Sequence, residues 1–296
     1  MKTIVTHDGK FHADEVFAIA FLKVIFKKIK IIRTRNLKDL DIDSVDYFVD
    51  ISDKFDNEKY FDHHFKSFDM YHDRDQKLKK ASFGLVFDRF ADLILPNKNV
   101  QNAVRVNIVI PIDAIDNRIY LTPDRYQYTD FSASRVISSY NRLYDGDEEL
   151  QNKQFLKAVT LAKTIIENTI RSFEREVNDK DRILELLESN TNPNFIVLDR
   201  YYNLNYIMRK NPKYNNLKFA IHPSTTNGQF IITKLRVESD VFFPESWSGQ
   251  RNEKLIKINN IEGSVFCHKD RFIAANETLE GAIKMVKAAI KHHYKN

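Results

Sequence analysis

The chain has 296 residues, which is enough for one large domain or two of medium size. Its 43% hydrophobic and 29% charged residues are typical of a globular protein and exclude an intrinsically disordered chain. The formal net charge of +5 is compatible with a polyanionic substrate, but it is too small to indicate nucleic-acid binding by itself.

The first sixty-odd residues predict strands that alternate with a helix. Apolar and β-branched runs predict strands at residues 2–6, 30–34, 45–51 and 59–62. A helix is expected over residues 15–29, with Asp14 as its N-cap. This alternation is typical of βαβ units and a mostly parallel sheet.

After Lys80 the pattern becomes helical, interrupted by a loop at residues 118–130. Helices are predicted over residues 82–95, 100–112, 132–143, 151–177 and 179–187. The segment Asn190-Thr191-Asn192-Pro193-Asn194 is the strongest boundary signal, so we expect one domain at residues 1–189 and another at 190–296. In the second, strands are predicted at residues 195–198, 218–222, 229–237, 265–268 and 271–274, before a helix over 279–292. The expected fold class is α/β, with a helix-flanked, mostly parallel sheet and then a smaller α+β domain.

Cysteine usage and hydropathy bear on the compartment. The one cysteine, Cys267, lies in an apolar run and is expected to be a buried structural thiol, which fits a reducing environment. The apolar stretch at residues 17–26 is short and interrupted by Lys23, so no membrane span is predicted. The N-terminus lacks the long apolar core of a signal peptide. We therefore expect a cytoplasmic or other reducing intracellular location, and the oligomeric state stays open.

Histidines and aspartates gather where the predicted strands end. His7 and Asp50 follow two strands, and Asp62-His63-His64 follows a third. His12 and Asp14 lie at the junction that enters the first helix. Because ligands bind at the carboxyl ends of strands in such sheets, these side chains are expected to meet. Oxygen and nitrogen donors without thiolates suit Mn²⁺ or Mg²⁺, and two such ions can activate water against a phosphate ester.

Each candidate has a less specific interpretation. Asp14 alone would be an N-cap, and Asp53 reads as a turn residue. Asp50 follows an apolar strand, where a lone buried carboxylate is costly, so it is the natural bridge between two ions. Asp113 and Asp116 share a helix face at i, i+3 spacing, so one can bind metal while the other orients a ligand.

Three further features favour ordinary structure. The seven basic residues between positions 16 and 38 favour a solvated helix face and a strand edge. The pair His292-His293 is read as a solvated tail, and Trp247 as an aromatic packed on a loop. No dinucleotide-binding, P-loop or CxxC motif is present.

These residues resemble the melanocyte-proliferating-gene family of metal-dependent hydrolases, related to the DHH phosphoesterases. The resemblance covers the chain from end to end, and its first-domain motifs are Thr6-His7-x-Gly9-x-Phe11-His12-x-Asp14-Glu15, Asp62-His63-His64, Ala81-Ser82-Phe83-Gly84-Leu85-Val86 and Ile112-Asp113-Ala114-Ile115-Asp116-Asn117. Its second-domain motifs are Pro244-Glu245-x-Trp247-x-Gly249, Phe266-x-His268 and Phe272-Ile273-x-x-Asn276-x-Thr278-x-x-Gly281-Ala282. The chain departs from this pattern at His12, where DHH enzymes have aspartate, and at Arg118 and Ala274-Ala275, which replace glycines.

The resemblance implies a DHH-like domain that binds Mn²⁺ or Mg²⁺, as two ions, followed by a substrate domain. Carried over residue by residue, it implies metal ligation by His7, His12, Asp14, Asp50, Asp62, His63 and Asp116. The residues that it implies for catalysis are Asp50, His64 and Asp113. Those that it implies for substrate binding are His64, Ser82, Arg118, His268, Arg271 and Asn276.

The activity that the resemblance implies is a 3′-to-5′ RNA or oligonucleotide exonuclease that uses two divalent ions and an activated water. The first alternative is a phosphoesterase for a small molecule such as pyrophosphate or a cyclic dinucleotide. The second is a non-catalytic RNA-binding protein that uses metal for structure. Turnover of defined oligoribonucleotides compared with the small substrates separates the exonuclease from the first alternative. The second alternative predicts that RNA binding survives Asp50→Asn and that the parent protein shows no turnover.

Overall fold

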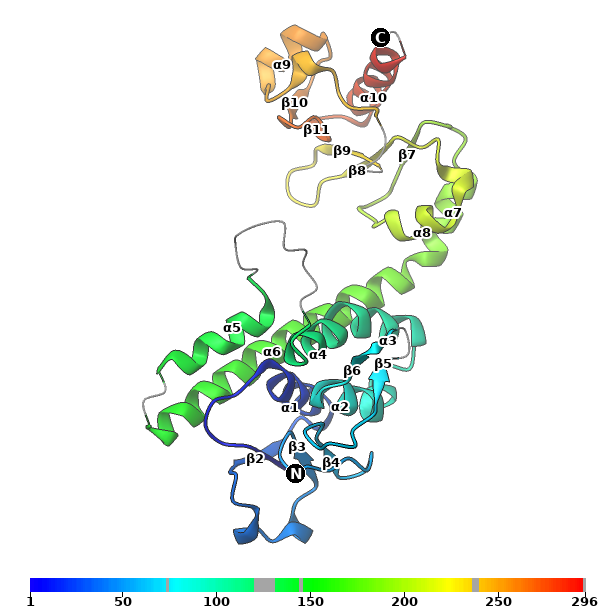
Figure 1. Cartoon of the computed structure of the whole chain (residues 1–296). Helices are drawn as coiled ribbons and strands as arrows, with labels where there is room; N and C mark the ends of the chain where they lie inside the picture. Colours follow the sequence, from blue (N-terminus) through cyan, green and yellow to red (C-terminus); the bar gives the residue numbers. More distant parts are fainter. Residues whose placement is uncertain (73–74, 120–130, 144–145, 236–239, 295–296) are drawn as a thin grey trace. The chain divides into compact units, whose positions relative to one another are not determined.

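The chain divides into two compact units. The computed structural model describes residues 1–72, 75–119, 131–143, 146–235 and 240–294 (Figure 1). Unit 1 comprises Met1–Arg175 and unit 2 comprises Glu176–Asn296. The sequence places the boundary later, at residue 190, because α7 (Lys180–Ser189) reads as a continuation of the preceding helices. In the structure, Ile183 and Leu187 of α7 belong to a core cluster of unit 2.

Unit 1 is built on a four-stranded parallel sheet in the order β2-β1-β3-β4. The strands are β1 (Lys2–Thr6), β2 (Ile29–Arg33), β3 (Tyr47–Val49) and β4 (Tyr60–Phe61). β1 pairs in parallel with β2 on one side and with β3 on the other, and β3 pairs in parallel with β4. The chain order therefore reverses between β1 and β3, which is where ligands bind in open α/β sheets. The α/β class expected from the sequence is confirmed.

Helix α1 (Ala13–Phe26) lies against this sheet and is apolar on nearly all sides. Every residue from Ala13 to Leu22 is buried, including two acidic ones. Such a helix is stable only inside a core. Phe17 and Phe21 of α1 pack on Phe83 and Phe87 of α2 (Ser82–Phe90). The helix begins at Ala13 with His12 as N-cap, so the expectation that Asp14 caps it is wrong; Asp14 lies inside the first turn.

A continuous helical segment runs from Lys98 to Asp116. It comprises α3 (Lys98–Val104), a π-helical turn (Arg105–Val109) and α4 (Ile110–Asp116). The predicted range ended at about residue 112, one turn too early, although the i, i+3 spacing of Asp113 and Asp116 had suggested that the two share a helix face. Asp113 and Asp116 both lie within α4, so the helix fixes the direction of their side chains. The π-helical turn just before α4 is a feature that occurs frequently at functional sites.

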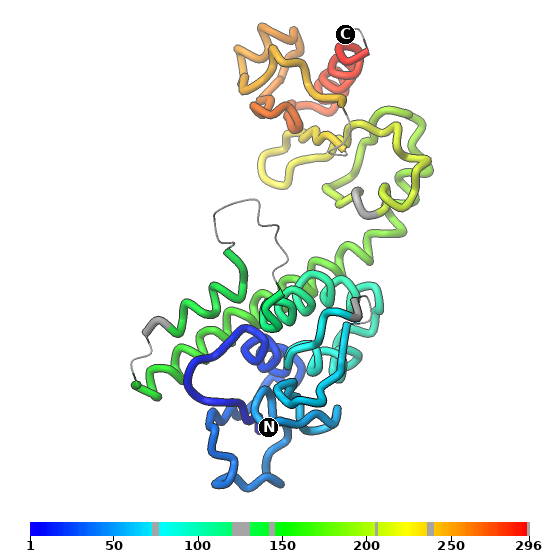
Figure 2. Tube along the Cα trace, in the orientation of Figure 1, coloured from blue at the N-terminus to red at the C-terminus, as the bar shows by residue number. Residues whose placement is uncertain are grey.

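The remaining helices of unit 1 agree with the sequence in place but not in length. α5 (Ala133–Ser139) is followed by a 3₁₀ turn, Tyr140–Leu143, and α6 (Glu148–Asn178) runs for 31 residues. The path of the chain can be followed in Figure 2. A hairpin of β5 (Tyr71–His72) and β6 (Asp75–Lys79) was not predicted. Most of the loop predicted at 118–130 lies outside the described residues.

Unit 2 is a mixed five-stranded sheet in the order β10-β11-β9-β8-β7. Its strands are β7 (Phe195–Val197), β8 (Phe219–Pro223), β9 (Phe230–Lys234), β10 (Ser264–Cys267) and β11 (Ile273–Asn276). β7 and β8 are parallel and the other pairs are antiparallel. Besides α7, its helices in the described residues are α8 (Asn205–Lys210), α9 (Asn252–Asn259) and α10 (Leu279–His293), of which α8 and α9 were not predicted. Positions 236 and 237 of the predicted strand 229–237 lie outside the described residues.

Two residues weighed from the sequence lie in the core of unit 2. Trp247 is buried and stacks on Phe243, as expected for a packed aromatic. Cys267 is also buried, and burial raises the pKa of its thiol to about 12, so it is a neutral core side chain. Among the described residues, no helix is both long and apolar enough to cross a membrane.

Candidate metal centre

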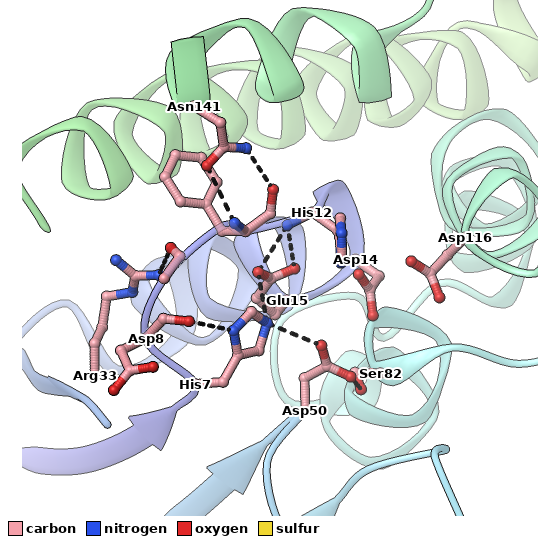
Figure 3. Close-up of polar contacts among 12 residues, drawn as sticks. His7, Asp8, His12, Asp14, Glu15, Arg33, Asp50, Ser82, Asp116 and Asn141 are labelled. Carbon is pink, nitrogen blue, oxygen red and sulfur yellow. Dashed lines mark hydrogen bonds and ion pairs between the residues drawn. The ribbon is translucent and has the colours of Figure 1, made fainter. Parts of the chain in front are cut away.

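The carboxyl ends of three parallel strands bring the predicted ligands together. His7 follows β1, Asp50 follows β3, and Asp62 and His63 follow β4. Because these strands are adjacent and parallel, their ends lie at one edge of the sheet. The first turn of α1 and the last turn of α4 contribute Asp14 and Asp116 to the same place (Figure 3).

His7 is held by its Nδ1 atom and faces the centre with Nε2. Nδ1 lies 2.9 Å from the Asp8 carbonyl oxygen and 3.1 Å from Nη2 of Arg35, and these contacts hold the ring in place. In metal-binding histidines one ring nitrogen binds the ion while the other is held by a second contact of this kind. Nε2 lies 3.2 Å from Glu15 Oε1 and 3.5 Å from Asp50 Oδ2. Burial opposes protonation of His7, but Asp50 and Glu15 outweigh it and raise its pKa to about 10, a sign of strong local negative charge.

Asp50 lies at the middle of the cluster. Its backbone has φ +59°, a conformation that Asp and Asn tolerate better than most residues. The Ser82 hydroxyl donates to Oδ1 at 2.8 Å, and the same oxygen lies 3.5 Å from His63 Nε2 and 3.3 Å from His64 Nδ1. Burial opposes ionisation of Asp50, but hydrogen bonds from His64 and His7 outweigh it and hold its pKa below the usual range.

Asp14 is the carboxylate that most needs a cation. Both of its oxygens, and Nε2 of His63, are buried without a hydrogen-bond partner among the described residues. His63 Nε2 lies 3.7 Å from Asp14, 3.5 Å from Asp50 and 3.3 Å from Asp116. Burial, followed by repulsion from Asp50, Asp116 and Glu15, raises the pKa of Asp14 well above its usual value. A buried charge without a partner is costly, and a divalent cation would offset that cost.

The donor atoms form four overlapping groups whose members all lie within 4.8 Å of one another. They are His7-His12-Glu15, Asp14-Glu15-Asp50, His12-Asp14-Asp116 and Asp50-His63-His64. Adjacent ligand atoms around Mg²⁺ or a similar ion are separated by roughly 3 Å, close to the contacts of Asp50 and His63. Oxygen and imidazole donors without sulfur suit Mn²⁺ and Mg²⁺. The residues therefore fit the expected ions, with Asp50 shared between groups.

Asp62 was predicted as a metal ligand, but in the structure its side chain holds His64 and the turn of Ser52 and Asp53. Its Oδ2 accepts backbone N–H groups of Ser52 and Asp53 at 2.6 and 2.7 Å. Its Oδ1 accepts the His64 N–H at 3.1 Å and lies 2.9 Å from His64 Nδ1. With four such contacts Asp62 joins none of the groups of donor atoms in the described chain. Burial opposes its ionisation, but the bond to His64 and the backbone bonds lower its pKa.

Asp113, predicted as catalytic, is also away from the cluster. It is fully buried, accepts the Gly84 N–H at 3.2 Å, and lies 2.9 Å from His72 Nε2. Burial raises its pKa to about 6, although His72 acts in the opposite direction. The i, i+3 spacing did bring Asp113 and Asp116 to nearby positions, but only Asp116 reaches the metal-binding groups. Asp113 instead joins α4 to the start of α2.

The predicted substrate-binding residues are spread over both units. Ser82 is fully buried and donates to Asp50. Arg118 is exposed just after α4, and its backbone has φ +60°, a conformation that glycine adopts more readily than arginine. His268 and Arg271 lie in the turn between β10 and β11, with a 38% exposed His268 side chain. Asn276 is fully buried: its Nδ2 donates to Glu262 and its Oδ1 accepts from Thr278, the N-cap of α10. Asn276 thus supports the residue that caps α10, and its predicted role in substrate binding stays a prediction.

Two buried residues of the site were missed from the sequence. Glu15 contacts His7 and His12, and His72 contacts Asp113. A signal existed for Glu15, because an acidic residue three positions after an N-cap is the second member of a capping box. No local signal pointed to His72, which belongs to the unpredicted hairpin.

The chain was compared with solved structures and with known sequences. A RecJ–Mn²⁺ structure from Thermus thermophilus matches with 14% identity and TM-score 0.29, covering 99% of this chain and 52% of that one. A pGpG-specific phosphodiesterase from Vibrio cholerae matches with 13% identity and TM-score 0.29, covering 99% and 98%. Scores this low do not establish a shared fold.

The sequence relatives are closer and match over nearly the whole chain. The MYG1 protein of Dictyostelium discoideum is 28% identical over 96% of this chain and 94% of its own length. The MYG1 exonuclease of Homo sapiens is 25% identical over 97% of this chain and 85% of its own length. The model of the uncharacterised protein family UPF0160, the MYG1 exonuclease family, matches residues 3–290. The chain therefore belongs to this family.

Proposed function

We propose that the chain is a metal-dependent phosphodiester hydrolase, and specifically a 3′-to-5′ exonuclease acting on RNA or short oligonucleotides. The observation that carries the proposal is the buried, unpartnered Asp14 carboxylate among His63, Asp50 and Asp116 at the carboxyl edge of the sheet. The relatives named MYG1 exonuclease, from Homo sapiens and Bos taurus, support the choice of nuclease.

Two Mn²⁺ or Mg²⁺ ions, when bound, would lower the pKa of water and neutralise charge on the phosphate. His7, His12, Asp14, Asp50, His63 and Asp116 would hold them, with Asp50 between the two. The phosphate would approach from the side of His64, whose side chain is 55% exposed. Nδ1 of His64 lies 2.9 Å from Asp62 and 3.3 Å from Asp50, so the other ring nitrogen would be available to donate to a phosphate oxygen.

The supporting residues hold this arrangement in place. Asp62 fixes the ring of His64 through Nδ1 and ties it to the turn of Ser52 and Asp53. Ser82 orients Asp50 by donating to Oδ1. Restraint of this kind matters because small displacements of catalytic groups lower rates steeply.

The same centre would also serve a small phosphoester, which keeps pyrophosphate and cyclic dinucleotides as the second candidate. The discriminating experiment offers 5′-labelled oligoribonucleotides, oligodeoxynucleotides, pyrophosphate and a cyclic dinucleotide to protein purified without chelator. Stepwise shortening of RNA from its 3′ end is the expected result. Turnover of the small substrates alone would favour the second candidate, and RNA binding without turnover of any substrate would favour the non-catalytic reading.

Metal dependence is tested on the same preparation. We expect chelation to abolish turnover, and Mn²⁺ or Mg²⁺, but not Zn²⁺ alone, to restore it, since the donor set has no thiolate. The matched variant is Asp50→Asn, because Asn tolerates the positive φ of this position and removes only the charge. Full activity after exhaustive chelation, or in Asp50→Asn, would refute the proposal.

A further inference from the structure

Glu15 occupies the third position of α1 and is fully buried. Both of its carboxylate oxygens accept the backbone N–H of His12, at 2.8 and 3.0 Å. This contact caps the helix and fixes the turn that carries His12 and Asp14 (Figure 3). A capping box needs only an acceptor at this position, and glutamine supplies one as well as glutamate. Capping therefore does not explain why the residue carries a charge.

A second contact of Glu15 points into the metal centre. Its Oε1 lies 3.2 Å from Nε2 of His7, the nitrogen that also lies 3.5 Å from Asp50. Glu15 also belongs to two of the four groups of donor atoms, one with His7 and His12 and one with Asp14 and Asp50. A carboxylate that only capped the helix would not need to lie close to these donor atoms.

The surroundings of Glu15 require positive charge. Asp14, Glu15 and Asp50 bring three buried carboxylates together, and neither oxygen of Asp14 has a hydrogen-bond partner in the described part of the chain. Buried carboxylates are stable when they are paired or bind a cation. Glu15 shares a group of donor atoms with His7 and His12, so an ion held by these histidines would lie within reach of its carboxylate.

We propose that Glu15 is a metal ligand, and that it holds one divalent ion together with His7, His12 and the shared Asp50. Asp14, His63 and Asp116 then hold the second ion with Asp50. This inference rests on the proposed function and adds a ligand to its metal centre. In this chain, one carboxylate both caps α1 and binds the ion.

The test is Glu15→Gln in the full-length protein, stripped of metal and titrated with Mn²⁺ by calorimetry and by electron paramagnetic resonance. Gln keeps the acceptor for the His12 N–H and removes the charge, so the stripped variant should unfold at or above the parent temperature. We expect its Mn²⁺ affinity to fall by at least about tenfold, with one tight ion in place of two. The matched control is Glu149→Gln, an exposed acid in the first turn of α6, which should bind as the parent does.

Two outcomes would overturn the role of Glu15. The first is Mn²⁺ affinity and stoichiometry equal to the parent in a folded Glu15→Gln protein, which would make Glu15 a cap only. The second is a stripped Glu15→Gln protein that does not fold, because the charge would then serve the fold without metal. Failure of the proposed function has a different signature, since the parent itself would bind no Mn²⁺ or would hydrolyse no phosphodiester.

Discussion

Asp62, His63 and His64 are consecutive in the chain but face different neighbours. Asp62 accepts backbone N–H groups from the turn after Asp50, and His63 lies among three carboxylates. The side chain of His64 is half exposed and bonds to Asp62. A motif of three polar residues after a strand therefore supplies a support, a ligand candidate and a solvent-facing donor.

Variants of this motif should separate these roles. His63→Ala should lower both bound metal and turnover, because it removes a donor from the group with Asp50. Asp62→Asn should retain most of the metal but lower kcat by about 10²-fold, since His64 loses its charged partner and the turn loosens. Metal content by elemental analysis and steady-state kinetics measure the two effects. Equal metal loss in both variants would show that Asp62 is a ligand after all.

At this scale the sequence predicted positions better than roles. His7, Asp50 and His63 could be placed because each follows a strand, and the ends of parallel strands coincide. Asp62 and Asp113 were assigned chemistry that the contacts do not support. Whether a carboxylate faces an ion or a backbone N–H depends on a rotation of its side chain, which no spacing in the sequence specifies.

Helices α2 and α4 approach each other closely at Gly84. The Asp113 carboxylate on α4 accepts the Gly84 N–H near the start of α2, and a Cβ at position 84 would overlap Asp113 Oδ2 and lie 3.2 Å from the Cβ of Lys80. α2 begins at Ser82, which donates to Asp50. The contact between the two helices thus fixes the element that orients the central carboxylate.

Gly84→Ala should destabilise the protein, against the usual preference of helices for alanine. Replacing glycine in a helix normally gains about 1 kcal/mol, but the overlap with Asp113 should cost about 1–3 kcal/mol and displace α2. Denaturant unfolding measures the change, and Thr164→Ala on the exposed face of α6 serves as the control. A Gly84→Ala protein more stable than the parent would mean that the two helices are not in contact here.

Among the elements, those with strong periodicity were found and those with weak signals were missed. α6 and α10 were predicted within a few residues, because their apolar positions repeat at helical spacing. The β5–β6 hairpin and α9 were not predicted, since charged side chains interrupt their apolar pattern. His72 was missed as a partner of Asp113 for the same reason.

In the whole molecule, the groups of metal-binding donor atoms found in the described residues all lie in unit 1. Unit 2 offers a different surface at the turn between β10 and β11. There His268 packs on the exposed Phe272, and Arg271 lies over Phe242 with φ +58°. A cation next to aromatic rings suits a phosphate and its base or sugar.

Arg271→Ala and His268→Ala should therefore raise the KM for an oligoribonucleotide by about tenfold each, as expected when one charged hydrogen bond is lost. Metal content should stay at the parent level, because the metal-binding residues belong to the other unit. Lys287→Ala, an exposed cation on α10, is the control and should change neither quantity. Parent values of KM and kcat in both variants would make this turn structural.

The sequence predicts two domains with a boundary at residue 190, whereas the compact units of the structure divide after Arg175. Asn190 and Pro193 mark a true break in secondary structure between α7 and β7. The preceding helix α7 nevertheless packs into unit 2 through Ile183 and Leu187. The end of a helix depends on the residues at that position. Which unit a helix packs against depends on long-range contacts, which a single sequence does not reveal.

The unpartnered carboxylate of Asp14 has a consequence for the life of this protein in a cell. On the proposed function, newly made chains without a bound ion keep several uncompensated carboxylates in their core, so they unfold more often. Proteases degrade open chains, so small changes in stability alter abundance several-fold. If the proposed centre binds a divalent ion, the amount of this protein should rise and fall with the supply of that ion, even at constant rates of synthesis.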